Sequence, residues 1–375
     1  VIILLIQIGG LGFMSVAAIA SFVLRRTITL HERMVMSAGL NLSDGGGIVR
    51  LTRRVLFGTF IIEGTGAVLL SCRFVPHYGF PKGITMGVFH AVSAFCNAGF
   101  DLMGTPDDPF QSLIGWAEDP LVNITVMALI VLGGLGFFVW SDVWDKHSFC
   151  RLRLHTKIVL TATAGLLLFG FGWTLLFEWS NPATLGAFDT PHKLLAAAFE
   201  SVTLRTAGFN TIDLGALTGP SQAVSCLLMF IGGSPGSTAG GIKTVTAAVL
   251  VLTAISAFCG RTTVSAFGRT IAPRSIMNAV TLLMAGGVLC LVGACAIAGI
   301  EDAPFHQCLF EAVSAFGTVG VSMGLTPTLA AASRVILIVM MYMGRVGVLT
   351  LGVAVFMRRR EPPRLKYPDA DVFIG

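Results

Sequence analysis

A short pattern recurs three times in this chain, and each copy ends in a glycine turn. The copies span residues 89–100, 199–209 and 310–321, and their glycines are Gly99, Gly208 and Gly320. Each copy is an amphipathic run too short to cross a bilayer, followed by small residues. In hydrocarbon, irregular backbone is tolerated only where protein buries it or where it lines a watery path. The repeated pattern therefore predicts a pore lined by backbone carbonyls.

The composition indicates a membrane protein. The chain has 375 residues, of which 54% are hydrophobic and 12% charged, whereas soluble domains carry about 25% charged residues. Its net charge of +5 does not indicate nucleic-acid binding, because the basic residues form four clusters between apolar segments. These clusters lie at 25–54, 146–157, 261–274 and 358–366, and the intervening connections carry the acidic residues. The positive-inside rule then predicts a multi-pass plasma-membrane protein whose basic loops and C-terminus are cytoplasmic.

Apolar segments and short helices follow one another in a repeating order. Spanning helices are predicted at 53–73, 121–141, 157–178, 275–299 and 329–357, with a long interrupted span at 220–258. Short helices are predicted at 84–96, 191–205 and 304–317. The unit of spanning helix, short helix with glycine turn, and spanning helix then occupies residues 46–150, 151–265 and 266–375.

Residues 1–45 are expected to hold the second membrane helix of a first unit. The glycine-rich stretch 8–13 matches residues 132–137, which lie in the second spanning helix of the next unit. We therefore expect a truncated N-terminus. The predicted fold is an all-α polytopic membrane protein with pseudo-fourfold repeats, a truncated first repeat and no strands. For Gly9, Gly10, Gly12, Gly133, Gly134 and Gly136, close helix packing is the favoured interpretation.

The three glycine turns are candidate strands of an ion filter. A cation filter replaces the hydration shell of its ion with rings of backbone carbonyls, and four strands close each ring. Glycine permits positive φ angles, and the preceding short helix directs its partly negative end towards the cation. The predicted ion-binding residues are Asn97, Ala98, Gly99, Phe100, Thr206, Ala207, Gly208, Phe209, Thr318, Val319, Gly320 and Val321. The alternative is that these glycines serve helix packing alone.

Residues 232–241 form the least helical stretch inside any apolar span. They are Gly232, Gly233, Ser234, Pro235, Gly236, Ser237, Thr238, Ala239, Gly240 and Gly241. Five glycines and one proline cannot sustain a helix. Broken helices at mid-membrane serve moving parts in transporters, so this stretch is predicted to be a gate below the second filter turn. The alternative is a static kink.

Two arginines lie inside the predicted membrane region. A buried intramembrane charge is costly and is a functional-site hypothesis by default. Arg345 is predicted to point inward, towards residues 232–241, and to repel cations; the alternative is a structural pairing. Arg205 is expected to brace the filter from behind. His90 is interpreted as a short-helix residue, and the eight cysteines as free thiols.

Residues 89–100, 203–210, 232–243 and 343–347 together resemble the membrane subunit of the Trk/Ktr/HKT superfamily of potassium transporters. The closing stretch 366–375 is similar to that of the Ktr branch, the KtrB type. The resemblance implies potassium uptake, a gating loop at 232–241 with Arg345 beneath the filter, and a homodimer. It also implies a cytoplasmic ring of nucleotide-binding regulatory subunits of the KtrA/TrkA kind. Potassium is the expected substrate, sodium a possible co-ion or activator, and no covalent cofactor is expected.

Three other functions are alternatives to potassium transport. Sodium or mixed transport stays open, because in this family the first filter strand helps to separate the two ions. A membrane-embedded enzyme is disfavoured, since Glu63 is the only carboxylate well inside a complete span and no His or second acid recurs near it. A purely structural scaffold would not need repeated glycine turns. We therefore expect no enzymatic activity, no nucleic-acid partner, and membrane lipid as the surroundings.

Overall fold

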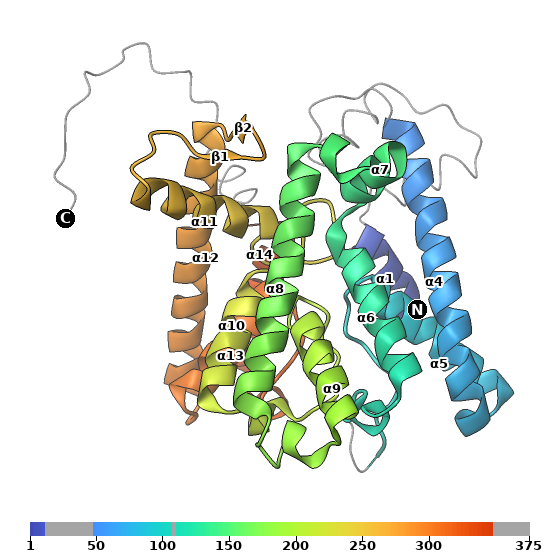
Figure 1. Cartoon of the computed structure of the whole chain (residues 1–375). Coiled ribbons are helices and arrows are strands. Elements are labelled where there is room, and N and C mark those ends of the chain that lie inside the picture. The colour runs from blue at the N-terminus through green and yellow to red at the C-terminus, as the bar shows by residue number, and fades with distance from the viewer. Residues whose placement is uncertain (12–47, 107–109, 348–375) are drawn as a thin grey trace.

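The computed structural model describes residues 1–11, 48–106 and 110–347, and helices dominate these residues (Figure 1). Their order repeats a long helix, a short helix, a turn and a further helix. The helices are α1 (Ile2–Leu11), α4 (Ile48–Tyr78), α5 (Phe80–Phe95), α6 (Pro120–Leu135), α7 (Phe137–Lys146), α8 (Leu154–Glu178), α9 (Thr190–Thr203), α10 (Gly219–Phe230), α11 (Thr244–Phe258), α12 (Pro273–Ile300), α13 (Phe305–Gly317) and α14 (Ala331–Val346). The predicted all-α membrane architecture is confirmed, whereas the division into units at 46, 151 and 266 stays a prediction.

Three long helices could each cross a bilayer. In α4, α8 and α12 the apolar stretches reach 27, 25 and 28 residues, and about 20 residues are enough. Each carries exposed apolar side chains on its outer face, such as Phe60, Leu168 and Met284. Such faces suit hydrocarbon rather than water, as expected of an integral membrane protein.

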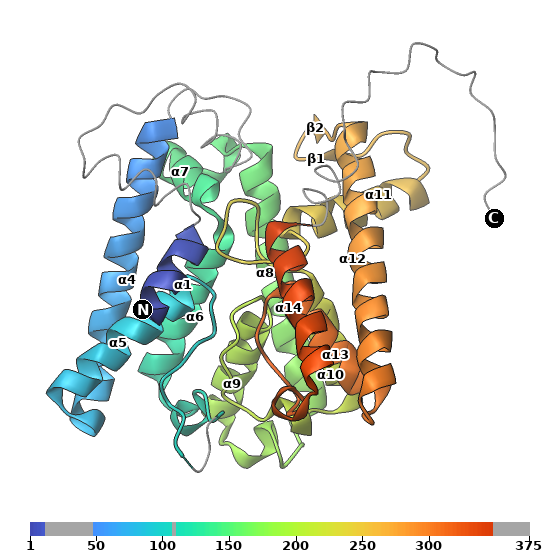
Figure 2. The same cartoon turned by 180° about the vertical axis from the view of Figure 1, so that it is seen from behind.

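A short helix packs against each long one: α5 on α4, α9 on α8 and α13 on α12. Prolines help to set where these short helices begin. Pro81 and Pro191 occupy the first turns of α5 and α9, and Pro304 directly precedes α13. Proline is favoured there because its missing N–H has no partner within the helix anyway. Most residues of α5 and α13 and half of those of α9 are buried. Helix α1 packs beside α5 (Figure 2).

The helix that closes each unit differs from unit to unit. Between α6 and α7 the chain bends by 91° at Gly136, whose φ is 91°. The predicted span 121–141 is therefore wrong as a single straight helix, because this glycine ends α6. Residues 231–243 separate α10 from α11, as the interrupted span predicted. The end of the predicted span 329–357 and the basic clusters at 25–47 and 358–366 lie outside the described residues.

A short antiparallel hairpin joins α11 to α12. Its strands are β1 (Ser265–Ala266) and β2 (Arg269–Thr270), so the expectation of no strands is wrong at this point. The two turn residues, Phe267 and Gly268, have φ angles of 49° and 74°. Positive φ at both central residues is the geometry that closes tight hairpins.

Candidate functional site

The three glycine turns share one backbone conformation. In each turn the first and third residues have positive φ, and the residue between them does not. The φ angles are 50°, 72° and 53° at Asn97, Thr206 and Thr318, and 69°, 89° and 90° at Gly99, Gly208 and Gly320. Alternation of this kind turns successive N–H groups to one side of the chain and their carbonyls to the other. A threonine rarely adopts such a φ, so the shape of these turns is enforced by their surroundings.

A serine or threonine of each short helix anchors its turn at two points. The backbone carbonyls of Ser93, Thr203 and Ser314 accept the N–H of the second turn residue, at 2.9, 3.0 and 2.9 Å. Their hydroxyls donate to the carbonyl of the fourth turn residue, at 2.6, 2.5 and 2.6 Å. The backbone carbonyl and the side-chain hydroxyl of one residue thus hold the second and fourth residues of each turn. The fourth carbonyl, of Phe100, Phe209 or Val321, is directed at the helix, which leaves the first three carbonyls of each turn to face elsewhere.

The three turns meet, although about 110 residues of chain separate neighbouring copies. A Cβ atom added to Gly99 would lie 2.7 Å from the carbonyl oxygen of Ala207, and one on Gly208 would lie 2.3 Å from that of Val319. A Cβ atom on Gly320 would approach the Cα of Gly208 to 4.0 Å. Only glycine fits at the first two positions, and the predicted filter residues lie together.

A second polar side chain holds the chain just beyond the turn. His90 accepts the N–H of Leu102 at Nε2 (3.3 Å), while its Nδ1 contacts the carbonyl of Met86 at 2.7 Å. At the same helical position, Glu311 accepts hydroxyl bonds from Ser322 and Thr326. His90 therefore serves the short helix, as interpreted from the sequence. Glu200 occupies this position in the second copy. It is buried, and its side chain has no hydrogen-bond partner among the described residues.

Residues 231–243 lie against the inner end of the turns. A Cβ atom on Gly240 would lie 2.1 Å from Oγ1 of Thr318, and one on Gly232 would lie 3.2 Å from Cγ2 of Thr206. The hydroxyl of Thr238 donates to the carbonyl of Phe95, two residues before Asn97, at 3.1 Å. The predicted gate segment thus touches all three copies of the repeated pattern.

The break between α6 and α7 supports this segment. The last carbonyls of a helix have no partner within it. In α6 those of Gly134 and Gly133 accept the N–H groups of Ser234 and Thr238, at 3.0 and 3.3 Å. In return, Phe137 at the start of α7 donates its N–H to the carbonyl of Gly236 at 2.9 Å.

Arg345 points inward and bonds to the gate segment. Its guanidinium donates to the carbonyl of Thr238 and to that of Gly9 in α1. The predicted direction of this side chain is confirmed, and its structural partners are backbone carbonyls rather than a carboxylate. Sequence reasoning missed a second cation, Lys243, whose Nζ donates to the carbonyl of Ala239 at 2.6 Å. Two positive side chains therefore hold consecutive carbonyls of residues 232–241.

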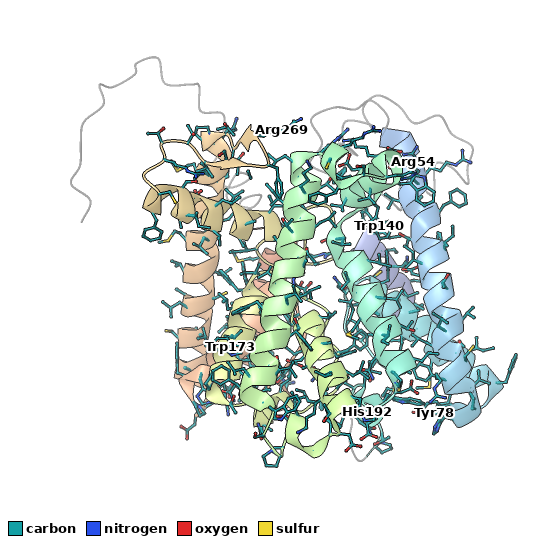
Figure 3. The ribbon with its side chains drawn as sticks, in the orientation of Figure 1. Arg54, Tyr78, Trp140, Trp173, His192 and Arg269 are labelled. Atoms are coloured by element: carbon teal, nitrogen blue, oxygen red, sulfur yellow. The ribbon has the colours of Figure 1, made fainter. Side chains whose placement is uncertain are left out.

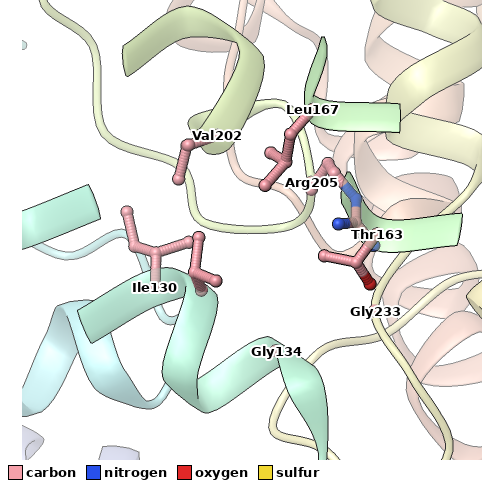
Figure 4. A pocket seen from close by; sticks show the side chains of 8 residues that line it. Ile130, Gly134, Thr163, Leu167, Val202, Arg205 and Gly233 are labelled. Carbon is pink, nitrogen blue, oxygen red and sulfur yellow. The ribbon is translucent and has the colours of Figure 1, made fainter. Parts of the chain in front are cut away.

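Arg205 joins the end of α9 to the gate segment. Its guanidinium donates to the hydroxyl of Thr244 at 2.9 Å and to the carbonyl of Gly232 at 3.3 Å. Figure 4 shows the side chain reaching into a cavity of about 10 Å³, between Thr163 of α8 and Gly233. Arg205 stands directly before Thr206, so it links the second turn to the segment beneath it.

Glu63, the intramembrane carboxylate of α4, has neighbours that suit pairing rather than catalysis. Both of its oxygens accept from Nε2 of Gln7 at 3.1 Å, and Sγ of Cys96 lies 3.8 Å from Oε1. Among the described residues, no group of three or more His, Cys, Asp or Glu side chains could hold a metal ion. The three glycine turns, by contrast, repeat one backbone conformation and one set of hydrogen bonds, so they are the candidate functional site.

Known proteins match this chain over almost all of its length. A family described as "TrkH: Cation transport protein" matches residues 2–361. The chain is 40% identical to the Ktr system potassium uptake protein B of Bacillus subtilis over 375 residues, which cover 100% of this chain and 82% of that protein. It is 38% identical to the potassium/sodium uptake protein NtpJ of Enterococcus hirae, with the same coverage of each chain.

The fold also matches a solved structure. The potassium transporter TrkH from Vibrio parahaemolyticus superposes with a TM-score of 0.71 at 16% sequence identity. The match covers 94% of this chain and 71% of the other. At that identity the comparison supports the fold alone.

Proposed function

Because the chain belongs to the TrkH family of cation transport proteins, we propose that it takes up potassium ions across the plasma membrane through a path lined by its three glycine turns. The observation that carries this proposal is that three turns lie in contact with one another. In each, the first and third residues have positive φ, and a serine or threonine of the short helix anchors the turn. The first three carbonyls of each turn would replace the water around the ion. The chain is a transporter of this family and not an enzyme, as its relatives are named.

In this proposal residues 232–241 are the gate. The segment lies against the first residue of two turns and is held largely by backbone hydrogen bonds to α6 and α7. Exchange of those bonds would let it move without unfolding a helix. Arg345 and Lys243 would add a positive barrier to cations in the closed state, since both donate to carbonyls of the segment.

A second candidate is sodium transport, or mixed sodium and potassium transport. One relative is named a potassium/sodium uptake protein, and the three turns share only the glycine at their third residue. Sodium could then be a substrate, a co-ion or an activator.

The partners and orientation belong to the same proposal. Several relatives are named as proteins of a Ktr system, which implies other components. We infer a homodimer that binds a cytoplasmic ring of nucleotide-binding regulatory subunits. The end of the molecule with Arg54 and Arg269 would face the cytoplasm, and the end with Tyr78 and His192 would face outward (Figure 3).

Substitution of the turn glycines tests the filter. We expect Gly208→Ser and Gly320→Ser to weaken potassium affinity and sodium exclusion, because the added side chain disturbs left-handed backbone. Uptake of both ions is measured in cells that lack their own potassium transporters. Gly165→Ser in α8 is the matched control, since no atom lies within 4 Å of a Cβ there. Unchanged potassium affinity and sodium exclusion in both filter variants would refute the filter.

A further inference from the structure

A hollow of about 460 Å³ is lined in part by Arg269. Figure 3 shows Arg269 at the same end of the molecule as Arg54. The hollow is formed by the loop before α8, the first turns of α8, and the β1–β2 hairpin. The lining residues are Cys150, Arg151, Leu152, Leu154, Lys157, Phe267 and Arg269. Three are cationic and none is acidic, and the volume is typical of a ligand site.

Lys157 is fixed in this hollow. Its Nζ donates to the carbonyl of Cys150 at 2.9 Å and lies 5.7 and 5.8 Å from the ring centres of Phe149 and Phe267. The two rings meet edge to face, with centres 6.1 Å apart. The ammonium group is therefore held in place by one carbonyl and two aromatic faces, with no carboxylate to neutralise it among the described residues.

The two arginines of the hollow are free to bind an anion. Arg151 and Arg269 are exposed and form no ion pair within the described part of the chain. Nearby, by contrast, Lys146 and Arg153 are both paired with Asp142, at 2.8 and 3.8 Å. A guanidinium presents paired donors that match the oxygens of a phosphate group. The hollow is thus lined by three positive side chains that no carboxylate of the described residues neutralises.

The hairpin forms one wall of the hollow. Its turn places Phe267 at a φ of 49°, which a bulky residue rarely adopts and where asparagine or aspartate is favoured. The aromatic side chain of Phe267 lies half exposed in the wall of the hollow, beside Lys157 and Arg269. Turn formation alone does not require an aromatic residue at this position.

The position of the hollow favours a lipid as the source of the phosphate. Leu154, at which the apolar span of α8 begins, lines the hollow, and Arg269 of its wall precedes the span of α12 by four residues. Phe149 and Phe267 are half exposed around it, and Phe258 at the end of α11 is 92% exposed. Basic pockets beside membrane helices at the cytoplasmic surface suit anionic headgroups. We propose that this hollow binds the phosphate headgroup of an anionic phospholipid of the cytoplasmic leaflet, an inference that rests on the proposed orientation.

Native mass spectrometry of the purified full chain tests this site. The protein in detergent is titrated with phosphatidylglycerol, and with phosphatidylcholine for comparison. We expect one phosphatidylglycerol retained per chain, and about 30-fold weaker retention in the double variant Arg151→Gln/Arg269→Gln. The control Arg261→Gln/Arg274→Gln removes two exposed arginines of the same end that do not line the hollow. It should retain the lipid as the unmodified protein does.

A third variant tests the aromatic wall of the hollow separately from its arginines. Phe267→Asn relieves the turn, so we expect unchanged or higher thermal stability together with weaker lipid retention. Equal losses in the double variant and its control would overturn the site, as would unchanged retention in the double variant. Displacement of the lipid by millimolar inorganic phosphate would overturn the lipid as ligand. Lipid retention is measured without ion flux, so its result can be interpreted even if the transport proposal fails.

Discussion

At the residue scale, each turn depends on one hydroxyl. Thr203 binds its turn through its carbonyl, which takes the N–H of Ala207, and through its hydroxyl, which donates to Phe209. Ser93 and Ser314 do the same in the other copies. The hydroxyl draws the fourth carbonyl away from the meeting point of the turns. In the proposed filter, this bond would set the direction of the three carbonyls before it.

We expect Thr203→Val to lower the preference for potassium over sodium about fivefold, because the variant keeps the shape of the side chain and loses one hydrogen bond of about 1 kcal/mol. The matched control is Ser201→Ala in the same helix. Its hydroxyl donates to Leu167 of α8 and not to the turn. Competitive uptake of the two ions by both variants is the measurement, and equal selectivity in the two would contradict the anchor.

The paired cations of the gate segment can be tested in the same assay. A unit charge about 8 Å from a permeating cation contributes roughly 2 kcal/mol at an effective dielectric constant of 20. We therefore expect Arg345→Ala and Lys243→Met each to raise potassium flux, by up to about 30-fold, with selectivity retained. Arg334→Ala is the control, since Arg334 lies on the same helix and binds the carbonyl of Pro327 near the start of α14. Flux that stays unchanged, or falls, in both gate variants would exclude the barrier.

Sequence reasoning reached some of these residues and not others. The inward direction of Arg345 followed from the cost of an unpaired charge in hydrocarbon. Lys243 also lies inside a predicted span, 220–258, but it directly follows the glycine-rich stretch and was not singled out. The anchors Ser93, Thr203 and Ser314 were visible as a repeated position, but their bonds depend on a backbone path that periodicity does not describe.

At the element scale, the end of α6 explains the paired glycines 133 and 134. A Cβ atom on Gly133 would lie 1.9 Å from the carbonyl oxygen of Phe95, at the end of α5. The same contact recurs in the last unit, where a Cβ atom on Gly344 would lie 1.8 Å from the carbonyl oxygen of Phe316. Close packing was the favoured interpretation of glycines 133 and 134 and of Gly9. The structure supports it at Gly133, whereas a Cβ atom on Gly9 would meet no atom within 4 Å.

This contact predicts opposite effects at two adjacent positions. Gly133→Ala should lower the free energy of unfolding by about 1–3 kcal/mol, since the added methyl group meets rigid backbone. Gly134→Ala should leave it unchanged or raise it by up to about 1 kcal/mol, because the nearest atom lies 3.5 Å from the new Cβ and alanine favours helix. Thermal unfolding of both variants in detergent decides the matter. Equal midpoints would remove the argument for close packing.

The long elements were predictable and their breaks only partly so. Hydropathy over about 20 residues located α4, α8 and α12, because burial in a bilayer depends on length and apolar composition alone. The bend at Gly136 was missed. Its cause is distant in sequence, since the carbonyls freed at the end of α6 find their donors in Ser234 and Thr238. The hairpin was not predicted because its turn has Phe267 before the glycine, where asparagine or aspartate is usual.

At the scale of the whole molecule, one arginine connects three separate parts of the chain. Arg345 joins α14 to the gate segment through Thr238 and to α1 through Gly9. Thr206 and Thr318 of the glycine turns contact the same segment, at Gly232 and Gly240. A displacement of residues 232–241 would therefore have to break contacts to α6, α7 and α14 together. This geometry favours a gate with two discrete positions over one that opens gradually.

The charge distribution predicts the orientation of the molecule. Arg54 and Arg269 lie at one end of the long helices, and Tyr78 and His192 at the other (Figure 3). Cationic loops are retained on the cytoplasmic side, so a cysteine at position 192 should react with a membrane-impermeant maleimide in intact cells. One at position 269 should react only after permeabilisation. Both are placed in a background without the exposed native thiols Cys72, Cys150, Cys259 and Cys295. Labelling of Arg269→Cys in intact cells, with His192→Cys protected, would invert the orientation and place the basic hollow on the outer leaflet.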